Sequence, residues 1–260
     1  MDIDNAWITE AARAMYPNAK ATTIDRHLVT PVSAVYNRAA EDQLCPPRRF
    51  RKRGKDNARI DWLTPEEAER LIKAIRVHQP HILRPVAIML SGGARTGETF
   101  PITREALNIP TGEIWIPETK NDEPRYLRLP RRGLDMVLEG DLPQTGPICR
   151  THHGKAYAVS AYRGSQIRAA WKMARKKAKL GPEITPHVLR HTWATWYYAA
   201  TKDFGGLMDL GGWKTPSVAN RYRKLAPEDL PERLLAHDWD FSRADYRPQS
   251  VVPFRAQARG

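Results

Sequence analysis

Cysteine is scarce in this chain: Cys45 and Cys149 are the only two in 260 residues. Two cysteines make neither a disulfide framework nor a zinc framework, so the sequence predicts a protein of the reducing cytoplasm. No apolar run approaches the roughly 20 residues that a membrane-spanning helix needs. The first ten residues, "MDIDNAWITE", are acidic and lack the basic and apolar regions of a signal peptide. We therefore expect no membrane partner.

Acidic residues are also in short supply. The chain has 29 Asp and Glu against 42 Lys and Arg, which gives a net charge of +13 and a pI of about 9.9. This balance favours a polyanionic partner, usually nucleic acid, and the alternative is a basic solvated surface. The carboxylates form no cluster suited to Mg²⁺, and the doublet His152–His153 lies in a loop without matching ligands. The sequence thus predicts no metal and no cofactor.

Four segments can be separated along the chain. Helical periodicity extends from Ala6 to Leu44, and "CPPRRFRKRGKDNAR" then combines proline, glycine and charge as linkers do. We expect a helical domain over residues 1–47, a basic linker over 48–59, a second domain over 60–235 and a mobile tail over 236–260.

Basic side chains gather in the linker and in one helix, "SQIRAAWKMARKKAKL". Such runs suit a DNA backbone, and their ordinary alternative is a solvated surface. The candidates for DNA-backbone contact are Arg48, Arg49, Arg51, Lys52, Arg53, Arg168, Lys172, Arg175, Lys176 and Lys177.

The second domain reads as mainly α with a small antiparallel β-sheet (α+β). Its first helix starts with Thr64 as N-cap and Pro65 at the first helical position, and Glu67 completes a capping box. An apolar segment, "LRPVAIMLSGG", follows, and "GEIWIPETKNDEPRYLRLP" alternates like a hairpin with "ETKNDEP" at its tip. A later helix, "TPHVLRHTWATWYYAA", has Thr185 at its N-cap and Pro186 in its first turn.

The segment "SGGARTGETF" is one residue away from a nucleotide-binding P-loop. Its glycines Gly92 and Gly97 have the P-loop spacing, but Glu98 stands where that motif needs lysine. A carboxylate there would repel the phosphates. Either the P-loop is broken, or Arg95 and Glu98 serve another kind of phosphate chemistry.

Two further segments carry candidate anion-binding groups. His187 and Arg190 are three residues apart near a helix start, where both face the same way and an anion is already favoured. Taken alone, they could be an ordinary surface pair. In "LGGWKTPSVANRYRKL", Tyr222 follows Trp213 by nine residues, and a lone tyrosine is usually a packing residue.

Taken together and in order, these segments resemble the signature of the tyrosine recombinase (phage integrase) family. "GARTGE" resembles its first arginine box, with Arg95 as a catalytic arginine and Glu98 as the carboxylate that buttresses it. "HVLRHTWAT" matches the most diagnostic segment, with His187 and Arg190. "LGGWKTPSVANRY" matches the final box. There Trp213 replaces the more usual histidine and still offers an N–H donor, and Tyr222 is the nucleophile.

The resemblance implies a reaction and partners. Tyr222 would attack a phosphate of double-stranded DNA, form a 3′-phosphotyrosyl link and free a 5′-hydroxyl, which Lys120 at the hairpin tip would protonate. His187 would assist proton transfer with Tyr222, and the arginines would clamp the phosphate. Rejoining reverses the step, so the family needs no ATP or metal for DNA integration or excision. Its members act as tetramers on DNA.

The N-terminal segment departs from the family pattern. Only about 59 residues precede the catalytic domain, and they resemble part of the family's helical (SAM-like) core-binding domain. Two functions stay open at this point. One is an active site-specific recombinase of a mobile genetic element. The other is a DNA-binding remnant or accessory factor that cannot complete recombination, and a topoisomerase-like nicking activity would use the same chemistry.

Overall fold

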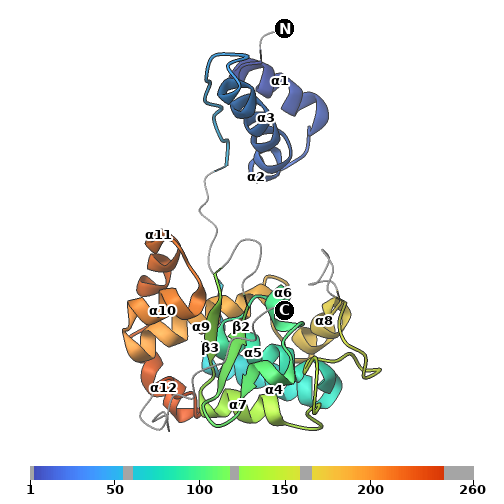
Figure 1. Ribbon diagram of the computed structural model, residues 1–260, viewed down its shortest axis with the longest axis vertical. Coiled ribbons are helices and arrows are strands. Elements are labelled where there is room, and N and C mark those ends of the chain that lie inside the picture. The colour runs from blue at the N-terminus through green and yellow to red at the C-terminus, as the bar shows by residue number, and fades with distance from the viewer. Residues whose placement is uncertain (1–2, 55–60, 118–122, 159–165, 243–260) are drawn as a thin grey trace, which may run out of the picture. The chain divides into compact units, whose positions relative to one another are not determined.

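The computed structural model describes residues 3–54, 61–117, 123–158 and 166–242 (Figure 1). The chain folds into two compact units, Met1–Arg59 and Ile60–Gly260. Each unit has its own hydrophobic core.

The first unit is helical, as the periodicity predicts. It contains α1 (Asn5–Met15), α2 (Ala21–Ile24), the π-helical turn η1 (Asp25–Val29) and α3 (Thr30–Glu41). Pro31 explains the π-helical turn, since its ring cannot donate a hydrogen bond and would clash with the carbonyl four residues earlier. The chain widens instead, and the N–H of Thr30 donates to the carbonyl of Asp25.

The predicted linker is wrong over residues 48–54, because these residues pack on this helical unit. Phe50 is buried in the core with Ile8 and Leu28. The carboxylate of Asp25, itself buried, accepts hydrogen bonds from the backbone N–H groups of Arg53 at 2.9 Å and Gly54 at 2.8 Å. The first half of the predicted linker is therefore part of the folded unit, and residues 55–60 lie outside the described residues.

The second unit opens with the predicted capping box. The Thr64 side chain accepts from the N–H of Glu67, and the Glu67 carboxylate accepts from the N–H of Thr64. The elements of this unit, in order, are α4 (Pro65–His78), η2 (Pro80–Ile82), α5 (Leu83–Gly92), α6 (Thr96–Thr99), η3 (Arg104–Ala106), β1 (Leu107–Asn108), β2 (Glu113–Ile116), β3 (Arg125–Arg128), α7 (Arg131–Leu138), α8 (Arg168–Lys177), α9 (Pro186–Thr201), α10 (Phe204–Gly211), α11 (Pro216–Ala219), η5 (Asn220–Lys224) and α12 (Leu230–Ala236).

The predicted hairpin is present as β2 and β3, with β1 added at the edge of β2. The three strands form an antiparallel sheet in the order β1-β2-β3, with Trp115 opposite Tyr126. Ile114 and Leu127 point into the core while Trp115 and Tyr126 point outward. The helices around this small sheet confirm the predicted α+β class.

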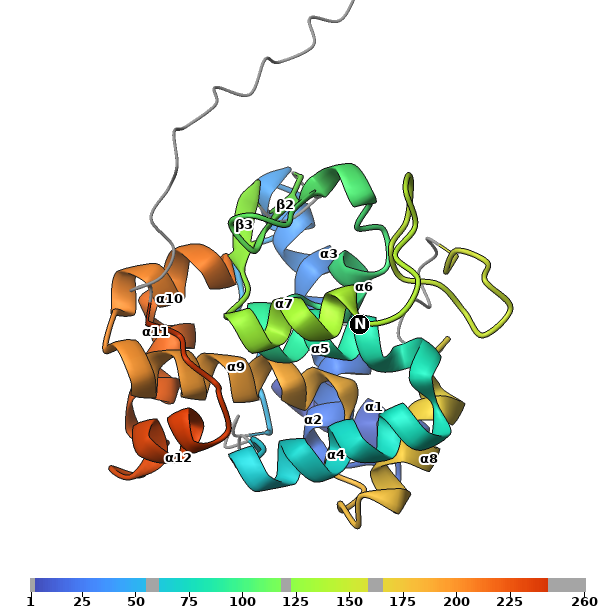
Figure 2. The same ribbon diagram turned by 90° about the horizontal axis from the view of Figure 1, so that it is seen from below.

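Helix α5 is the centre of the second unit. Its apolar sequence is buried almost all round, and it packs against α7 and α9 (Figure 2). In Figure 1, α10, α11 and α12 cover one flank of the unit, and α8 lies on the opposite flank. This packing fixes the ends of α5, α9 and α10, where the candidate site residues lie.

Residues 236–260 are predicted to form a mobile tail, and this prediction is wrong for the first of them. Trp239 is fully buried against Trp196, and its indole N–H donates to Glu69. Phe241 is buried beside Tyr197. The folded structure therefore continues beyond residue 236, because the side chains of Trp239 and Phe241 pack in the core. Residues 243–260 lie outside the described residues.

The described helices include none with the length and apolar character that a membrane span requires.

Candidate active site

The arginine box begins where α5 ends. Gly93 adopts the left-handed backbone conformation with φ of 71°, and a Cβ at this position would overlap the Trp193 ring. Only glycine fits both demands. The turn leads directly into Arg95 and the short helix α6, and the backbone N–H of Arg95 donates to the Glu98 carboxylate at 2.8 Å.

Glu98 lies between two arginines. One carboxylate oxygen accepts from the Arg95 guanidinium at 2.6 Å, and the other accepts from Arg125 at 2.7 Å. Burial acts to raise the pKa of Glu98, but Arg125 and Arg95 outweigh it, so the pKa lies below its usual value. Glu98 therefore stays ionised. It holds Arg95 in place, as a buttress would.

Arg125 is a buried cation that the sequence patterns missed. Its side chain is 5% exposed, and its Nε donates to the carbonyl of Leu210 at 3.1 Å while an Nη donates to Glu98. An arginine at an inward position of a strand was the available signal, because such a residue needs a buried partner. Arg125 thus connects the arginine box to the end of α10.

Arg190 connects the same two regions from α9. It is 3% exposed, and its two Nη atoms donate to the carbonyl oxygens of Gly93, at 2.6 Å, and Gly211. Burial and then the nearby Arg95 lower the pKa of Arg190. Even so, a guanidinium remains charged at neutral pH. The helix places a rigid positive charge beside the arginine box.

Trp213 covers this arginine. Helix α10 ends at Gly211, Gly212 takes the left-handed conformation with φ of 61°, and the N–H of Trp213 donates to Met208 at 3.0 Å. The Arg190 guanidinium carbon lies 4.6 Å from the centre of the Trp213 ring, which is a cation–π contact. The Trp213 ring also packs beside Tyr222, with 5.4 Å between the two ring centres.

Tyr222 is packed into this cluster rather than displayed on the surface. It belongs to η5 and is 2% exposed. Its hydroxyl lies 2.7 Å from Nδ1 of His191. Burial raises the pKa of Tyr222, although Arg190 and Arg221 act in the opposite direction. The phenol is therefore protonated at rest and needs an acceptor for its proton before it can act as a nucleophile.

His191 is the second site residue that the sequence patterns missed. The patterns assigned proton transfer with Tyr222 to His187, but the structure gives the contact to His191, one helical turn further along α9. His187 is exposed and meets the His191 ring edge-on at 4.7 Å between ring centres. The available signal was the spacing, because residues four apart share a helix face with each other.

Both histidines lie in a positively charged environment. Although part of the His187 ring is exposed, the protein around it desolvates the rest, and this desolvation, then Arg190 and Arg95, lower the pKa of His187. Burial, then His187, Arg190 and Arg221, lower the pKa of His191 to about 4. Both rings are therefore neutral at physiological pH. A neutral imidazole can accept a hydrogen bond from the phenol at one nitrogen.

The structure brings together six of the seven predicted catalytic residues: Arg95, Glu98, His187, Arg190, Trp213 and Tyr222. The seventh, Lys120, lies outside the described residues, so its prediction is untested. No group of three or more His, Cys, Asp or Glu suited to a metal occurs within the described ranges.

The residues predicted to contact the DNA backbone differ in their exposure and in their hydrogen bonding. Arg168, Lys172, Lys176 and Lys177 are exposed along α8, and Arg49, Arg51 and Lys52 are exposed on the first unit. Arg48 and Arg53 instead donate within their own unit, to the carbonyl of Ile3 at 2.6 Å and to the Thr9 hydroxyl at 2.7 Å. Arg175 is half-buried, and its Nε is buried without a hydrogen-bond partner.

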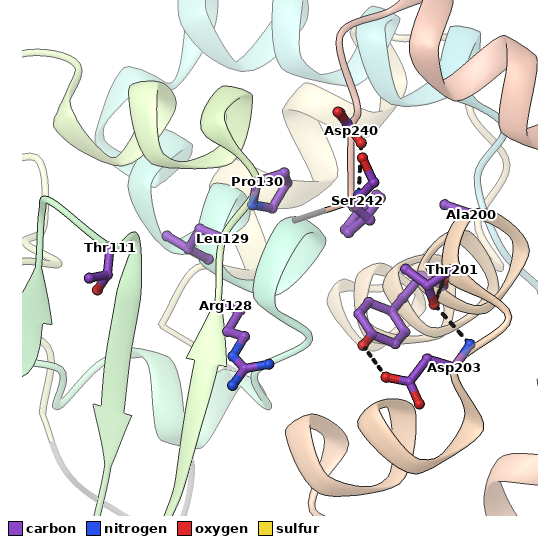
Figure 3. Close-up of a pocket in the computed structure, with 11 residues that line it drawn as sticks. Thr111, Arg128, Leu129, Pro130, Ala200, Thr201, Asp203, Asp240 and Ser242 are labelled. Carbon is purple, nitrogen blue, oxygen red and sulfur yellow. Dashed lines mark hydrogen bonds between the residues drawn. The ribbon is translucent and has the colours of Figure 1, made fainter. Parts of the chain in front are cut away.

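A separate cavity of about 390 Å³ lies between the end of β3, the α9–α10 corner and residues 240–242 (Figure 3). Arg128, Asp203 and Asp240 are among the residues that line it, and the Tyr197 hydroxyl donates to Asp203 across part of its wall. The lining contains none of the predicted catalytic residues. Its mixed charge also does not suit a phosphate backbone.

Comparisons with known proteins agree with the geometry. The sequence profile of the phage integrase family matches residues 61–229. The integrase of Salmonella phage P22 is 27% identical over 190 residues, which cover 70% of this chain and 48% of the relative. The tyrosine recombinase XerA of Thermococcus kodakarensis is 24% identical over 176 residues, which cover 65% of this chain and 59% of that protein.

A solved structure shows the same fold. The Tn1549 transposon integrase in complex with circular intermediate DNA aligns with a TM-score of 0.65 at 17% identity, covering 90% of this chain and 85% of that one. With the profile matching most of its length, the chain belongs to the phage integrase family. It spans about half the length of the curated relatives that it matches.

Proposed function

We propose that this protein is a site-specific DNA recombinase that breaks and rejoins DNA through a covalent 3′-phosphotyrosine intermediate. The observation that supports this most directly is the single cluster in which Arg190 contacts Trp213, and Trp213 contacts Tyr222. A buried cation that is held by hydrogen bonds and lies beside a phenol contributes little to packing. It is well suited to a reaction in which a phosphate gains negative charge next to a tyrosine.

The chemistry follows from the residues. Arg95 and Arg190 bind the non-bridging phosphate oxygens, and Glu98 fixes Arg95 for that task. His187 and the Trp213 indole N–H add hydrogen-bond donors at the same phosphate. The Tyr222 oxygen attacks phosphorus, and Lys120 gives a proton to the departing 5′ oxygen. Attack of a 5′-hydroxyl on the phosphotyrosine then reverses the sequence, so the step conserves bond energy and calls for no cofactor.

Double-stranded DNA is the proposed partner. The net charge of +13 and the exposed basic residues of α8 and of residues 49–52 supply a sequence-independent attraction to the backbone. Strand exchange joins two duplexes and needs several active sites, so the proposal includes a homo-oligomer, a tetramer, assembled on DNA. The protein would act in the cytoplasm, at the DNA of a mobile genetic element.

A nicked suicide duplex tests this function. The duplex carries sequence from the ends of the gene's own element, with a nick placed so that the cleaved fragment diffuses away and the covalent product accumulates. The expected result is a DNA-linked protein band on a denaturing gel. Retained binding in a mobility-shift assay with no such band would overturn the recombinase proposal and favour a DNA-binding remnant or accessory factor.

Changing Trp213 to phenylalanine is expected to slow cleavage about tenfold. Phenylalanine keeps an aromatic face against Arg190 but loses the indole N–H, and one charge-assisted hydrogen bond contributes roughly 1.5 kcal/mol. Trp213→His restores a ring donor and should recover most of the rate. Single-turnover cleavage of the suicide duplex measures both variants. Equal rates for Trp213→Phe and the unchanged protein would exclude a donor role for the indole.

A further inference from the structure

The Tyr222 hydroxyl has a defined partner in the resting protein. It lies 2.7 Å from Nδ1 of His191, which is the length of a strong hydrogen bond. Tyr222 belongs to η5 and His191 to the middle of α9, so the contact joins two segments that are 31 residues apart in sequence. Their ring centres are 5.8 Å apart and tilted by 35°.

We propose that His191 is a catalytic residue and accepts the phenolic proton when Tyr222 attacks the DNA phosphate. This inference rests on the proposed function, and it assigns the task to a residue other than His187. Geometry selects between the two histidines. His191 contacts the reacting oxygen directly, whereas His187 is exposed and, within the described residues, has its ring contact with the His191 ring.

The surroundings of His191 keep its ring neutral. Burial, and then His187, Arg190 and Arg221, lower the pKa of His191 to about 4, so the resting ring is neutral. The proposed transfer uses the tautomer in which Nε2 carries the hydrogen and Nδ1 accepts from the phenol. In that tautomer the hydrogen bond has the direction that proton transfer needs, and the donor oxygen is the nucleophile itself.

The proposed step balances as follows. The O–H bond of Tyr222 breaks, its proton moves to Nδ1 of His191, and the phenolic oxygen bonds to phosphorus. The bond from phosphorus to the 5′ oxygen breaks, and that oxygen takes a proton from a general acid, for which Lys120 is the candidate. In the rejoining step, the imidazolium of His191 returns its proton to the departing phenolate.

The surroundings of His191 make this transfer dependent on DNA. In the free protein, burial and then the nearby basic side chains oppose an imidazolium, and burial raises the pKa of Tyr222, so Tyr222 keeps its proton. A phosphodiester bound to Arg95 and Arg190 brings negative charge next to the ring, and that charge increases further as the attacked phosphorus gains an oxygen. The bound phosphate therefore favours protonation of His191 at the moment when the nucleophile is needed.

Single-turnover cleavage of the suicide duplex tests the assignment with the full chain. His191→Ala should cleave about 100-fold more slowly, the usual size of a general-base contribution, with DNA binding unchanged. His191→Asn can accept a hydrogen bond from Tyr222 but cannot hold its proton at neutral pH, so it should stay slow. Added imidazole should raise the rate of His191→Ala. Thermal melting confirms that both variants are folded.

A duplex with sulfur in place of the 5′ bridging oxygen separates the two ends of the reaction. A thiolate leaves without an acid, so this substrate should restore Lys120→Ala but leave His191→Ala slow. Full activity of His191→Asn, or recovery of His191→Ala on the sulfur substrate, would overturn the assignment. An unchanged rate for His191→Ala would do the same. Failure of the unchanged protein to form any adduct would instead contradict the proposed function.

Discussion

Replacing Tyr222 with phenylalanine is expected to abolish covalent attachment to DNA while DNA binding stays within about twofold. The variant keeps the ring that packs beside Trp213 and loses only the hydroxyl and its hydrogen bond to His191. Removing one such bond costs the fold about 1 kcal/mol. The reaction, in contrast, loses its nucleophile, because phenylalanine has no oxygen that could attack the phosphorus. Denaturing gels and mobility shifts on the same duplex measure the two quantities.

Tyr157 offers a matched control for this change. Its hydroxyl is buried without a hydrogen-bond partner, and its ring is stacked on Phe100. Tyr157→Phe deletes the same atom from another buried tyrosine and should leave both cleavage and binding unchanged, with stability equal or slightly higher. A DNA-linked band from Tyr222→Phe would show that another residue is the nucleophile. Loss of the band in Tyr157→Phe would show instead that the assay reports general packing.

Local sequence patterns predicted the structure correctly where a residue type has the same physical role in any fold. The capping box at Thr64 formed because threonine and glutamate at that spacing satisfy the same backbone donors in any fold, and the proline between them has no N–H to satisfy. The hairpin formed because alternation sorts Ile114 inward and Trp115 outward. The clustering of Arg190, Trp213 and Tyr222 followed from the resemblance to a family, which already contains the long-range arrangement that periodicity lacks.

The errors arose where tertiary contacts decide. Residues 48–54 are as basic as a linker, and only the buried Phe50 and the acceptor Asp25 attach them to the first unit. Trp239 lies in a stretch without periodicity and is nevertheless fully buried. The motif assigns proton transfer with Tyr222 to His187, whereas the hydroxyl of Tyr222 contacts His191 in the structure. The direction of each side chain on α9 is what selects His191.

Glu98 is expected to be the most costly charge to remove from the site. Glu98→Ala leaves two guanidinium groups without their carboxylate, and one of them, Arg125, is 5% exposed. Breaking one partner of a buried ion pair destabilises a protein by about 3–5 kcal/mol, because the remaining charge stays desolvated. Urea unfolding followed by tryptophan fluorescence measures the loss, since every tryptophan except Trp7 lies in the second unit.

Asp135→Ala is the matched control, because Asp135 forms an ion pair of similar length with Arg131, at 2.8 Å, but on the surface. The two side chains are 53% and 80% exposed, and such pairs contribute about 0–1 kcal/mol. A similar loss of stability in the two variants would mean that Glu98 is not held as a buried pair. The rate of DNA cleavage distinguishes the two variants further, because Glu98 positions Arg95 and Asp135 does not.

The same carboxylate makes stability depend on pH in a predictable direction. The pKa of Glu98 in the folded protein lies below its ordinary value of 4.5, because Arg125 and Arg95 together outweigh its burial. Its contribution is therefore complete above pH 4.5 and is lost as pH falls through the lower, folded pKa. Glu98→Gln keeps the shape and removes this titration. The stability difference between the unchanged protein and Glu98→Gln should be largest near pH 7 and shrink steadily below pH 4.5, and a difference that stayed constant would place the effect in packing rather than in charge.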